Sequence, residues 1–421
     1  MLNILSIIGL GYIGLPTATL LASRKQKVVG VDISPHVVDK INRGDIHIIE
    51  PELDILVQAA VGSGSLRATL LPEPADVFLI AVPTPLTSLR QPDLSHIEAA
   101  AKSIVPVLAK GNLVILESTS PVGTTERLAN WLAQARPDLS FPQQAGEASD
   151  IRIAYCPERV LPGRTVHELV TNDRVIGGMT SKCAEAAVAF YELFVQGECI
   201  VTNVRTAEMC KLAENSFRDV NIAFANELSM ICDEQGIDVW ELIKLANRHP
   251  RVNILQPGCG VGGHCIAVDP WFVVNSAQEN ANLIRMARTV NDAKTDWVMR
   301  KIEEAIDDLL ASGMALDDIR IACFGISFKP NIDDLRESPA LRIAQTLAKH
   351  HHGKLAIVEP NLQALPGELG ADAVLMTLDE AVSWGHILVL LVDHAEFKQA
   401  KFRFDQKHKM IDTRGIWRRG E

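Results

Sequence analysis

The feature that most constrains the fold of this chain is a glycine-rich turn directly after its first apolar segment. Residues 2–8 form a short apolar run that predicts a β-strand, and Gly9, Gly11 and Gly14 follow in a Gly-x-Gly-x-x-Gly pattern before a stretch with helical spacing. Glycines at these positions allow a tight turn and a close backbone approach to a pyrophosphate at the helix start. The order strand, turn and helix therefore predicts a doubly wound α/β domain that binds a dinucleotide.

A carboxylate at the end of the next strand indicates which dinucleotide binds. Residues 27–31 predict a second strand, and Asp32 follows it, about 20 residues beyond the glycine turn. A carboxylate at this place can bind the ribose 2′-hydroxyl of NAD and repels the 2′-phosphate of NADP. The predicted cofactor is NAD, bound by the turn and by this acid: Gly9, Gly11, Tyr12, Ile13, Gly14 and Asp32.

Length, charge and cysteine usage limit the other possibilities. The 421 residues suffice for two or three domains, and the formal net charge of -11 argues against binding to nucleic acid or to an anionic membrane surface. Residues 1–23 carry no charge, but Pro16, three glycines and several polar residues argue against a membrane span or a signal peptide. The eight scattered cysteines are typical of reduced thiols, so a cytoplasmic protein is expected.

Strands and helices alternate through the first half of the chain. Residues 76–82, 113–116 and 151–155 predict further strands, and residues 175–178 are expected to complete a first Rossmann-like domain over residues 1–203. Polar loops follow these strands. Because ligands of parallel sheets bind at the carboxyl ends of the strands, contacts are expected in those loops, which contain Thr84, Thr119, Thr125, Glu158, Arg159 and Val160.

A long helix without proline or glycine is predicted over residues 206–235. Lys211, Asn215 and Arg218 fall at i, i+4 and i+7 and therefore share one helix face. Two interpretations stay open: hydrogen-bond donors for a site, or a solvated stripe beside Glu214. The apolar residues of this segment suit a helix that links domains or forms a homodimer, and residues 204–315 are predicted to form a central helical domain.

The last region, residues 316–421, again alternates strands with helices. Residues 319–324, 355–359, 387–393 and 410–412 predict strands, and residues 338–350 a helix. We therefore expect a second Rossmann-like domain without the glycine signature, which binds a second nucleotide. The predicted fold is thus α/β, with two Rossmann-like doubly wound domains joined by a long central helix.

A cysteine in the run from Gly260 to Pro270 points to the chemistry. Cys265 follows a glycine-rich loop, is expected to begin a helix, and would allow an NAD enzyme to hold an aldehyde covalently and oxidise it again. Cys259, His264 and Cys265 lack the second Cys/His pair of a structural zinc site, so no metal is predicted. Cys156, at a strand end, is interpreted as a buried structural thiol.

Two other functional classes share parts of this pattern. A single-step hydroxyacid dehydrogenase also has an NAD domain and a helix with Lys and Asn four residues apart. A non-catalytic NAD-binding regulator would need neither the thiol nor the lysine. Cys265 and the βα region after residue 316 argue against both classes.

Six ordered segments resemble the UDP-glucose/GDP-mannose dehydrogenase family, and the resemblance covers essentially the whole chain. Members oxidise the C6 primary alcohol of a nucleotide sugar to a carboxylate with NAD. The matching segments are residues 9–14, 118–124, 157–158, 207–215, 260–265 and 328–338.

Within that family, the chain is similar to the N-acetylhexosamine branch. Val268 precedes Asp269 where the UDP-glucose branch has lysine, and residues 156–163, 249–251 and 265–271 also look like the N-acetylhexosamine branch. The resemblance implies oxidation of UDP-N-acetyl-D-mannosamine to UDP-N-acetyl-D-mannosaminuronate, for surface polysaccharides of the enterobacterial common antigen type. UDP-N-acetylglucosamine and UDP-glucose remain alternative substrates.

The resemblance also implies roles for individual residues. Cys265 would carry a thiohemiacetal and then a thioester, with two NAD used per turnover. The expected catalytic residues are Cys265, Lys211, Asn215, Asp269, Glu158 and Thr119. Further cofactor contacts are expected from Thr84, Thr125 and Arg336. The expected substrate contacts are Arg159, Val160, Lys211, Asn215, Arg218, His249, Arg251, Gly262 and Lys329.

Overall fold

The computed structural model describes residues 4–48, 50–161, 163–263, 265–369, 373–400 and 408–417. His264 and the first residues of the predicted strand at 2–8 lie outside the described residues. The chain forms two compact units, residues 1–214 with 271–276 and residues 215–270 with 277–421. The unit boundary falls inside helix α9 (Val204–Gln235), and the three-domain division at 203/204 and 315/316 stays a prediction.

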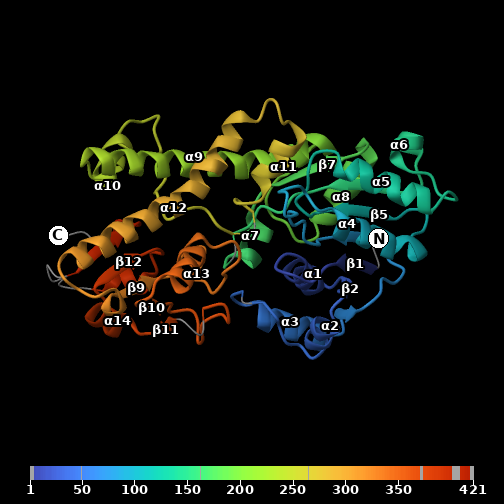
Figure 1. Cartoon of the computed structure of the whole chain (residues 1–421). Coiled ribbons are helices and arrows are strands. Elements are labelled where there is room, and N and C mark those ends of the chain that lie inside the picture. Colours follow the sequence, from blue (N-terminus) through green and yellow to red (C-terminus); the bar gives the residue numbers. More distant parts are fainter. Residues whose placement is uncertain are drawn as a thin grey trace. The chain divides into compact units, whose positions relative to one another are not determined.

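The N-terminal unit is built on an eight-stranded sheet with the order β3-β2-β1-β4-β5-β6-β7-β8 (Figure 1). Its neighbouring strands run parallel except β6 and β7, which are antiparallel. The first six strands have the order of a dinucleotide-binding Rossmann fold, as predicted. The strands are β1 (Ile4–Ile8), β2 (Lys27–Val31), β3 (Leu66–Thr69), β4 (Val77–Ile80), β5 (Leu113–Leu116), β6 (Arg152–Tyr155), β7 (Arg174–Gly178) and β8 (Cys199–Asn203).

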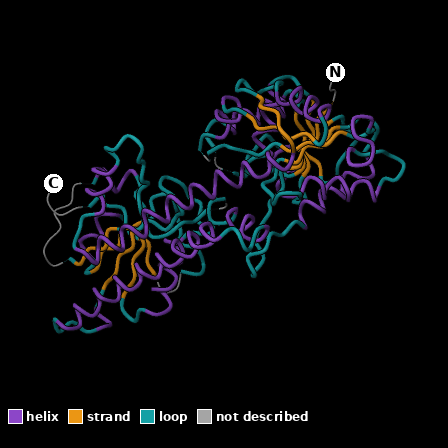
Figure 2. The backbone as a smooth tube through the Cα atoms, turned by 90° about the horizontal axis from the view of Figure 1, so that it is seen from above, coloured by secondary structure: helices purple, strands orange, loops and turns teal. Residues whose placement is uncertain are grey.

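Helices cover both faces of this sheet, and each face has its own apolar core. One core includes Leu15, Leu53 and Phe190, and the other includes Ile97 and Leu128. Figure 2 shows these strands side by side with helices around them. The helices of the unit are α1 (Gly14–Ser23), α2 (Pro35–Asn42), α3 (Leu53–Gly62), α4 (Ser95–Ile104), α5 (Thr124–Ala135), α6 (Pro142–Ala145), α7 (Thr165–Thr171) and α8 (Ser181–Tyr191).

Two strands at the sheet edges differ from the sequence prediction. Strand β3 was not predicted, and the strand predicted at 175–178 does not complete the sheet, because β8 follows it and pairs with β7. Residues of β8 are exposed or half-buried, and those of β3 alternate with polar side chains. Edge strands bury little apolar surface, so their sequences lack the apolar run on which the prediction depended.

The C-terminal unit contains a five-stranded parallel sheet with the order β11-β10-β9-β12-β13, so the predicted second Rossmann-like fold is confirmed. A second long helix, α12 (Asn282–Ala311), was not predicted. The strands are β9 (Arg320–Phe324), β10 (Lys354–Val358), β11 (Ala373–Leu375), β12 (Ile387–Leu390) and β13 (Lys409–Asp412). The other helices are α10 (Val239–Ala246), α11 (Asp269–Ser276), which crosses the unit boundary, α13 (Pro339–His350), α14 (Leu378–Trp384) and α15 (Ala395–Gln399).

Two features are absent from the described residues: a membrane-spanning helix and a cluster of metal ligands. No described helix has the length and apolar character needed to cross a membrane. No group of three or more His, Cys, Asp or Glu side chains in the described ranges is arranged to hold a metal ion.

Candidate active site

The glycine turn after β1 has the shape that the cofactor prediction requires. Gly9 has a φ of +93°, and a Cβ on Gly14 would lie 1.8 Å from the carbonyl oxygen of Gly9, so helix α1 can begin only if residue 14 has no side chain. A Cβ on Gly11 would meet nothing within 4 Å. The backbone at Gly11 is therefore open on the side where a pyrophosphate would approach, and the turn fits NAD.

Asp32 lies directly beside this turn. One oxygen of its carboxylate accepts a hydrogen bond from the N–H of Leu10 at 3.1 Å, and the other accepts one from the N–H of Ser34 at 2.9 Å. Each carboxylate oxygen has a second lone pair, so Asp32 can still accept a hydrogen bond from a ribose hydroxyl.

The predicted threonines follow two neighbouring strands: Thr84 lies in the loop after β4, Thr119 in the loop after β5, and Thr125 at the start of α5. The hydroxyl of Thr84 donates to the carbonyl of Thr119. Thr125 is fully buried, and its hydroxyl donates to Glu208 at 2.7 Å. Glu208 also accepts from the N–H groups of Gly123 and Thr125, at the start of α5. The sequence analysis gave Glu208 no role, because its partners are more than 80 residues away.

Lys211 on α9 is paired with Glu158, which follows β6. Lys211 is 6 % exposed, and its Nζ lies 3.9 Å from Oε2 of Glu158. Burial raises the pKa of Glu158, while the positive charges of Lys211 and Arg174 oppose that rise. The solvated-stripe interpretation is therefore wrong for Lys211, and a buried acid–base pair of this kind is typical of functional sites.

The two residues after Glu158 are held in place by polar contacts. The N–H of Val160 donates to the Glu158 carboxylate. Arg159 forms an ion pair with Glu214 at 2.9 Å and donates to the carbonyl of Asp173. This fixed segment places two predicted substrate contacts beside the Lys211–Glu158 pair.

In the C-terminal unit, Cys265 lies in a turn before α11. Its carbonyl accepts from the N–H groups of Val268 and Asp269, at 3.1 and 2.8 Å, and its side chain is exposed. The expectation that Cys265 begins a helix is wrong, because α11 begins four residues later at Asp269. Asp269 is 2 % exposed and accepts a hydrogen bond from the amide of Asn215. The candidate nucleophile thus shares one turn with a buried carboxylate.

The glycines before Cys265 are required by close packing. A Cβ on Gly262 would lie 2.4 Å from the carbonyl oxygen of Glu337, and one on Gly263 would lie 2.8 Å from the ring of Phe328. The N–H of Gly263 also donates to the carbonyl of Arg336 at 3.2 Å. This packing brings the segment that contains Arg336 against the cysteine loop.

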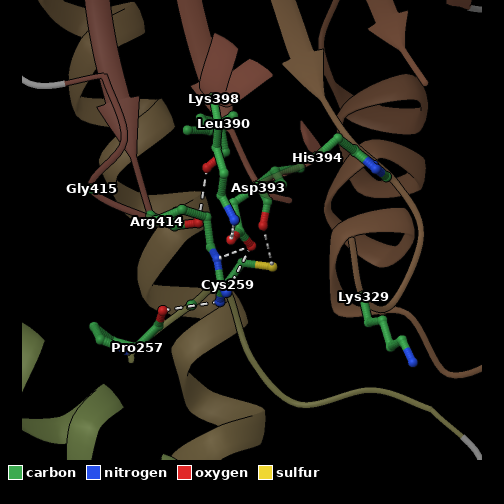
Figure 3. A network of polar contacts seen from close by, with 12 residues as sticks. Pro257, Cys259, Lys329, Leu390, Asp393, His394, Lys398, Arg414 and Gly415 are labelled. Atoms are coloured by element: carbon green, nitrogen blue, oxygen red, sulfur yellow. Dashed lines mark hydrogen bonds and ion pairs between the residues drawn. The ribbon is translucent and has the colours of Figure 1, made fainter. Parts of the chain in front are cut away.

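A polar network holds the start of the same loop (Figure 3). Arg414 donates to the carbonyl of Pro257 at 3.1 Å and to Asp393 at 2.8 Å, and Lys398 pairs with the same aspartate. The thiol of Cys259 donates to the carbonyl of Leu391 at 3.7 Å. Arg414 and Asp393 were not predicted as site residues, although Asp393 is the last residue of one predicted strand and Arg414 lies two residues after another.

The remaining predicted substrate contacts are exposed, except Lys329, which is half-buried. Arg218 is exposed on α9, and His249 and Arg251 are exposed in the turn after α10. The N–H of Arg251 donates to Nδ1 of His249 at 3.3 Å. Lys329 lies in the loop after β9 and is drawn beside the network in Figure 3.

Cys156 does not have the environment of a reactive thiol. It is fully buried, and burial raises its pKa to about 12, so the thiolate is strongly disfavoured. The interpretation of Cys156 as a structural thiol is confirmed.

Comparisons with known proteins agree with this geometry. Three models of the UDP-glucose/GDP-mannose dehydrogenase family match: the NAD binding domain at residues 3–195, the central domain at 205–293 and the UDP binding domain at 322–419. A UDP-N-acetyl-D-mannosamine dehydrogenase of Yersinia pestis is 61% identical over 415 residues, which cover 98% of this chain and 99% of that protein.

Two further relatives show how wide the similarity is. An NDP-N-acetyl-D-galactosaminuronic acid dehydrogenase of Ralstonia nicotianae is 62% identical, over 98% of this chain and 96% of that protein. The structure of a UDP-D-ManNAc dehydrogenase from Pyrococcus horikoshii matches with a TM-score of 0.88 and 38% identity, over 99% of this chain and 96% of that one. The chain therefore belongs to the UDP-glucose/GDP-mannose dehydrogenase family and is an NAD-dependent nucleotide-sugar dehydrogenase.

Proposed function

We propose that this chain oxidises the C6 hydroxyl of UDP-N-acetyl-D-mannosamine to the carboxylate, with two NAD per turnover. The observation that carries the proposal is the exposed thiol of Cys265, one turn from the buried carboxylate of Asp269, in a chain with the NAD fingerprint. A thiol gives an alcohol dehydrogenase a covalent route from aldehyde to acid. The mannosamine relatives, at 60–61% identity, support this sugar.

The first oxidation requires a base for the proton of the C6 hydroxyl. Lys211 accepts this proton, and Glu158, 3.9 Å away, keeps the side chain of Lys211 oriented. NAD, when bound at Gly9 to Gly14, accepts one hydride in each oxidation. The product of this step is the C6 aldehyde.

The second oxidation proceeds on the cysteine. The thiolate of Cys265 adds to the aldehyde carbon, and the amide of Asn215 and the ammonium of Lys211 donate hydrogen bonds to the oxyanion. Loss of the second hydride leaves a thioester. Water then attacks the thioester carbon and gives its proton to a carboxylate, and the uronate leaves as the thiol re-forms. Asp269 and Glu158 are the two candidate bases, and Thr119 lies in the loop that positions the water.

We assign the remaining contacts by ligand. The cofactor is bound by Gly9, Gly11, Tyr12, Ile13, Gly14, Asp32, Thr84, Thr125 and Arg336, mainly within the predicted domain 1–203. The substrate is bound by Arg159, Val160, Lys211, Asn215, Arg218, His249, Arg251, Gly262 and Lys329, and its UDP moiety by the predicted domain 316–421.

A panel of nucleotide sugars tests the substrate assignment. With NADH absorbance as the readout, UDP-N-acetylmannosamine should give the highest kcat/KM, well above UDP-glucose and GDP-mannose. A nucleotide of N-acetylgalactosamine is the second candidate substrate, because the NDP-N-acetyl-D-galactosaminuronic acid dehydrogenase is 62% identical to this chain. A highest value for UDP-glucose would contradict the N-acetylhexosamine assignment, and one for UDP-N-acetylglucosamine would contradict only the epimer.

Replacement of the nucleophile tests the covalent route. The intact enzyme should form two NADH per sugar and release no free aldehyde. Cys265→Ala should retain the first hydride transfer and stop at the aldehyde or its hydrate, because no thioester can form. Cys199→Ala, at a half-buried thiol on the sheet edge, is the matched control. Two NADH and uronate at the normal rate from Cys265→Ala would remove this residue from the mechanism.

We further propose a homodimer formed through α9. Phe217, Phe224 and Ile231 are exposed on this helix at intervals of seven residues, the spacing of a helix-pairing stripe. Phe224→Asp should give monomers in size-exclusion chromatography with light scattering, whereas Glu227→Gln on the same helix should not. A dimeric Phe224→Asp would contradict this interface.

The scattered positions of the eight cysteines support a cytoplasmic, reducing compartment, and we place the product in surface polysaccharide synthesis of the enterobacterial common antigen type. Fractionation of the producing cells tests the compartment, and the loss of the polysaccharide on deletion tests the pathway.

A further inference from the structure

A second buried carboxylate follows the strand next to the one before Glu158 and has no role in the mechanism above. Glu117 directly follows β5, and its side chain is fully buried. One of its oxygens accepts from the hydroxyl of Tyr191 at 3.2 Å and lies 3.8 Å from Nη1 of Arg174. Its other oxygen has no hydrogen-bond partner among the described residues.

The guanidinium of Arg174, on β7, is equally unusual. Its side chain is 1 % exposed and lies over the ring of Tyr191, and its Nη2 donates to the carbonyl of Leu169 at 3.2 Å. Its Nε and Nη1 have no hydrogen-bond partner in the described part of the chain. The desolvation cost of a buried ion pair is recovered only when the two groups also form direct hydrogen bonds. A contribution to stability therefore does not account for the Arg174–Glu117 pair.

Arg174 is shared between two carboxyl groups. Its charge opposes the burial that raises the pKa of Glu117 to about 7, and it also opposes the rise in the pKa of Glu158. The negative charge of Glu158 in turn raises the pKa of Glu117. Arg174 thus acts electrostatically on both carboxyls: Glu117 lies 3.8 Å from its Nη1, and Glu158 has its ion pair with Lys211 at 3.9 Å.

We propose that Glu117 is a positioning residue for the Lys211–Glu158 pair: its carboxylate occupies Arg174, so that Glu158 stays available to Lys211 and to the hydrolytic water. This inference rests on the proposed function. When Glu117 is protonated, its negative charge no longer offsets that of Arg174, so the guanidinium holds the pKa of Glu158 lower and Glu158 becomes a weaker base. The groups that face Glu117 are Arg174 on β7, Tyr191 on α8, and Cys156 and Glu158 after β6.

The pH dependence of kcat with UDP-N-acetylmannosamine separates this role from a structural one. In the wild type, kcat should rise as the pH passes about 7, where Glu117 ionises. Glu117→Gln should match the wild type within about twofold on the acid side, because both side chains are neutral there. On the alkaline side it should be several-fold slower, because only the wild type then carries a negative charge at residue 117 that offsets the effect of Arg174 on Glu158.

Two further variants sharpen the experiment. Glu117→Asp keeps the carboxylate and should keep the rise. Tyr191→Phe removes a hydrogen bond that lowers the pKa of Glu117, so the rise should move to higher pH. The control is Glu185→Gln, which neutralises an exposed glutamate on α8 and should leave the profile unchanged. An equal loss at every pH in Glu117→Gln, or an unchanged rise near pH 7, would overturn the proposal.

A spectroscopic readout keeps this inference distinct from the proposed function. Infrared difference spectra should show a protonated-carboxyl band that disappears near pH 7 and is missing in Glu117→Gln. If the wild type reduced NAD with no nucleotide sugar, the proposed function would fail while this band still reported on Glu117. A fully active wild type that lacks the band would contradict the inference alone.

Discussion

The two sheets contain the same backbone turn after their first strands but use it differently. Gly9 after β1 and Gly325 after β9 have φ values of +93° and +85°, and each donates its N–H at 2.8 Å to the last residue of the neighbouring strand, Val31 or Val358. A carboxylate follows each of those neighbours, as Asp32 and Glu359. The second unit therefore repeats the turn of the first without its glycine motif.

The difference lies in what surrounds the second carboxylate. Glu359 is 3 % exposed and accepts from the N–H groups of Ile326 and Ser327, from His394 and from Asn361. Asp32 accepts two backbone N–H groups and is only half-buried. Also, α1 begins at Gly14, whereas α13 begins fourteen residues after Gly325. The same strand order thus leaves an acid half-exposed in one unit, where we propose that it binds NAD, and uses an acid to hold a loop in the other.

The largest effect is expected at Gly14, where helix α1 begins directly after the turn that follows β1. Gly14→Ala would place a Cβ 1.8 Å from the Gly9 carbonyl oxygen and should lower the free energy of unfolding by about 3 kcal/mol or more, with loss of NAD binding. Gly11→Ala, in open space, should leave unfolding in denaturant unchanged. Equal stability of the two variants would mean that the turn can relax.

The next largest effect is expected at Glu359, which holds the loop after β9. Glu359→Gln should lower the free energy of unfolding by about 2 kcal/mol, because it weakens charged hydrogen bonds that are buried. NAD affinity, measured by calorimetry, should not change. A weaker affinity for NAD would break the assignment of Glu359 to loop support.

Asp32→Ala should give the opposite pattern. The affinity for NAD should fall about tenfold or more, which corresponds to the loss of one charged hydrogen bond. The ratio of the affinity for NAD to that for NADP should also fall. The unfolding midpoint should change little because Asp32 is half-buried. Equal use of NADP by the unmutated protein would contradict the role of Asp32.

The smallest effect is a dependence of stability on acid pH. Burial alone would raise the pKa of Glu359, but His394 and the N–H of Ile326 hold it below its ordinary value of 4.5. The stability from this lowered pKa is complete above about 4.5 and is lost as the pH falls through the folded-state pKa. The slope of unfolding free energy against pH below this value should therefore be smaller in Glu359→Gln. Identical slopes would show that Glu359 does not contribute.

The sequence predicted features that depend on local pattern and position. The glycine turn, Asp32, the helix over residues 206–235 and the strands of both sheet centres need only short segments to be recognised. The burial of Lys211 could not be decided from spacing, because a helix face with Lys, Asn and Arg suits solvent as well as a site.

Contacts between distant segments were beyond this kind of prediction. Glu117 and Arg174 are 57 residues apart, and their pairing depends on how β5 and β7 lie in the sheet. Neither residue has a sequence signal beyond a charged side chain next to an apolar run. A charged residue in such a position is a useful indication of a buried pair, since burial of an unpaired charge is costly.

The eight cysteines of this chain differ in nucleophilicity because their surroundings differ. Burial raises the pKa of most of them, to about 12 for Cys323 and about 11 for Cys259, and Cys265 is the exposed one. An alkylating reagent at neutral pH therefore meets one exposed thiol per chain, whereas Cys199 and Cys210 are half-buried and burial raises their pKa values. A single covalent label would count intact molecules in a preparation, and an oxidant would reach the same sulfur before any other.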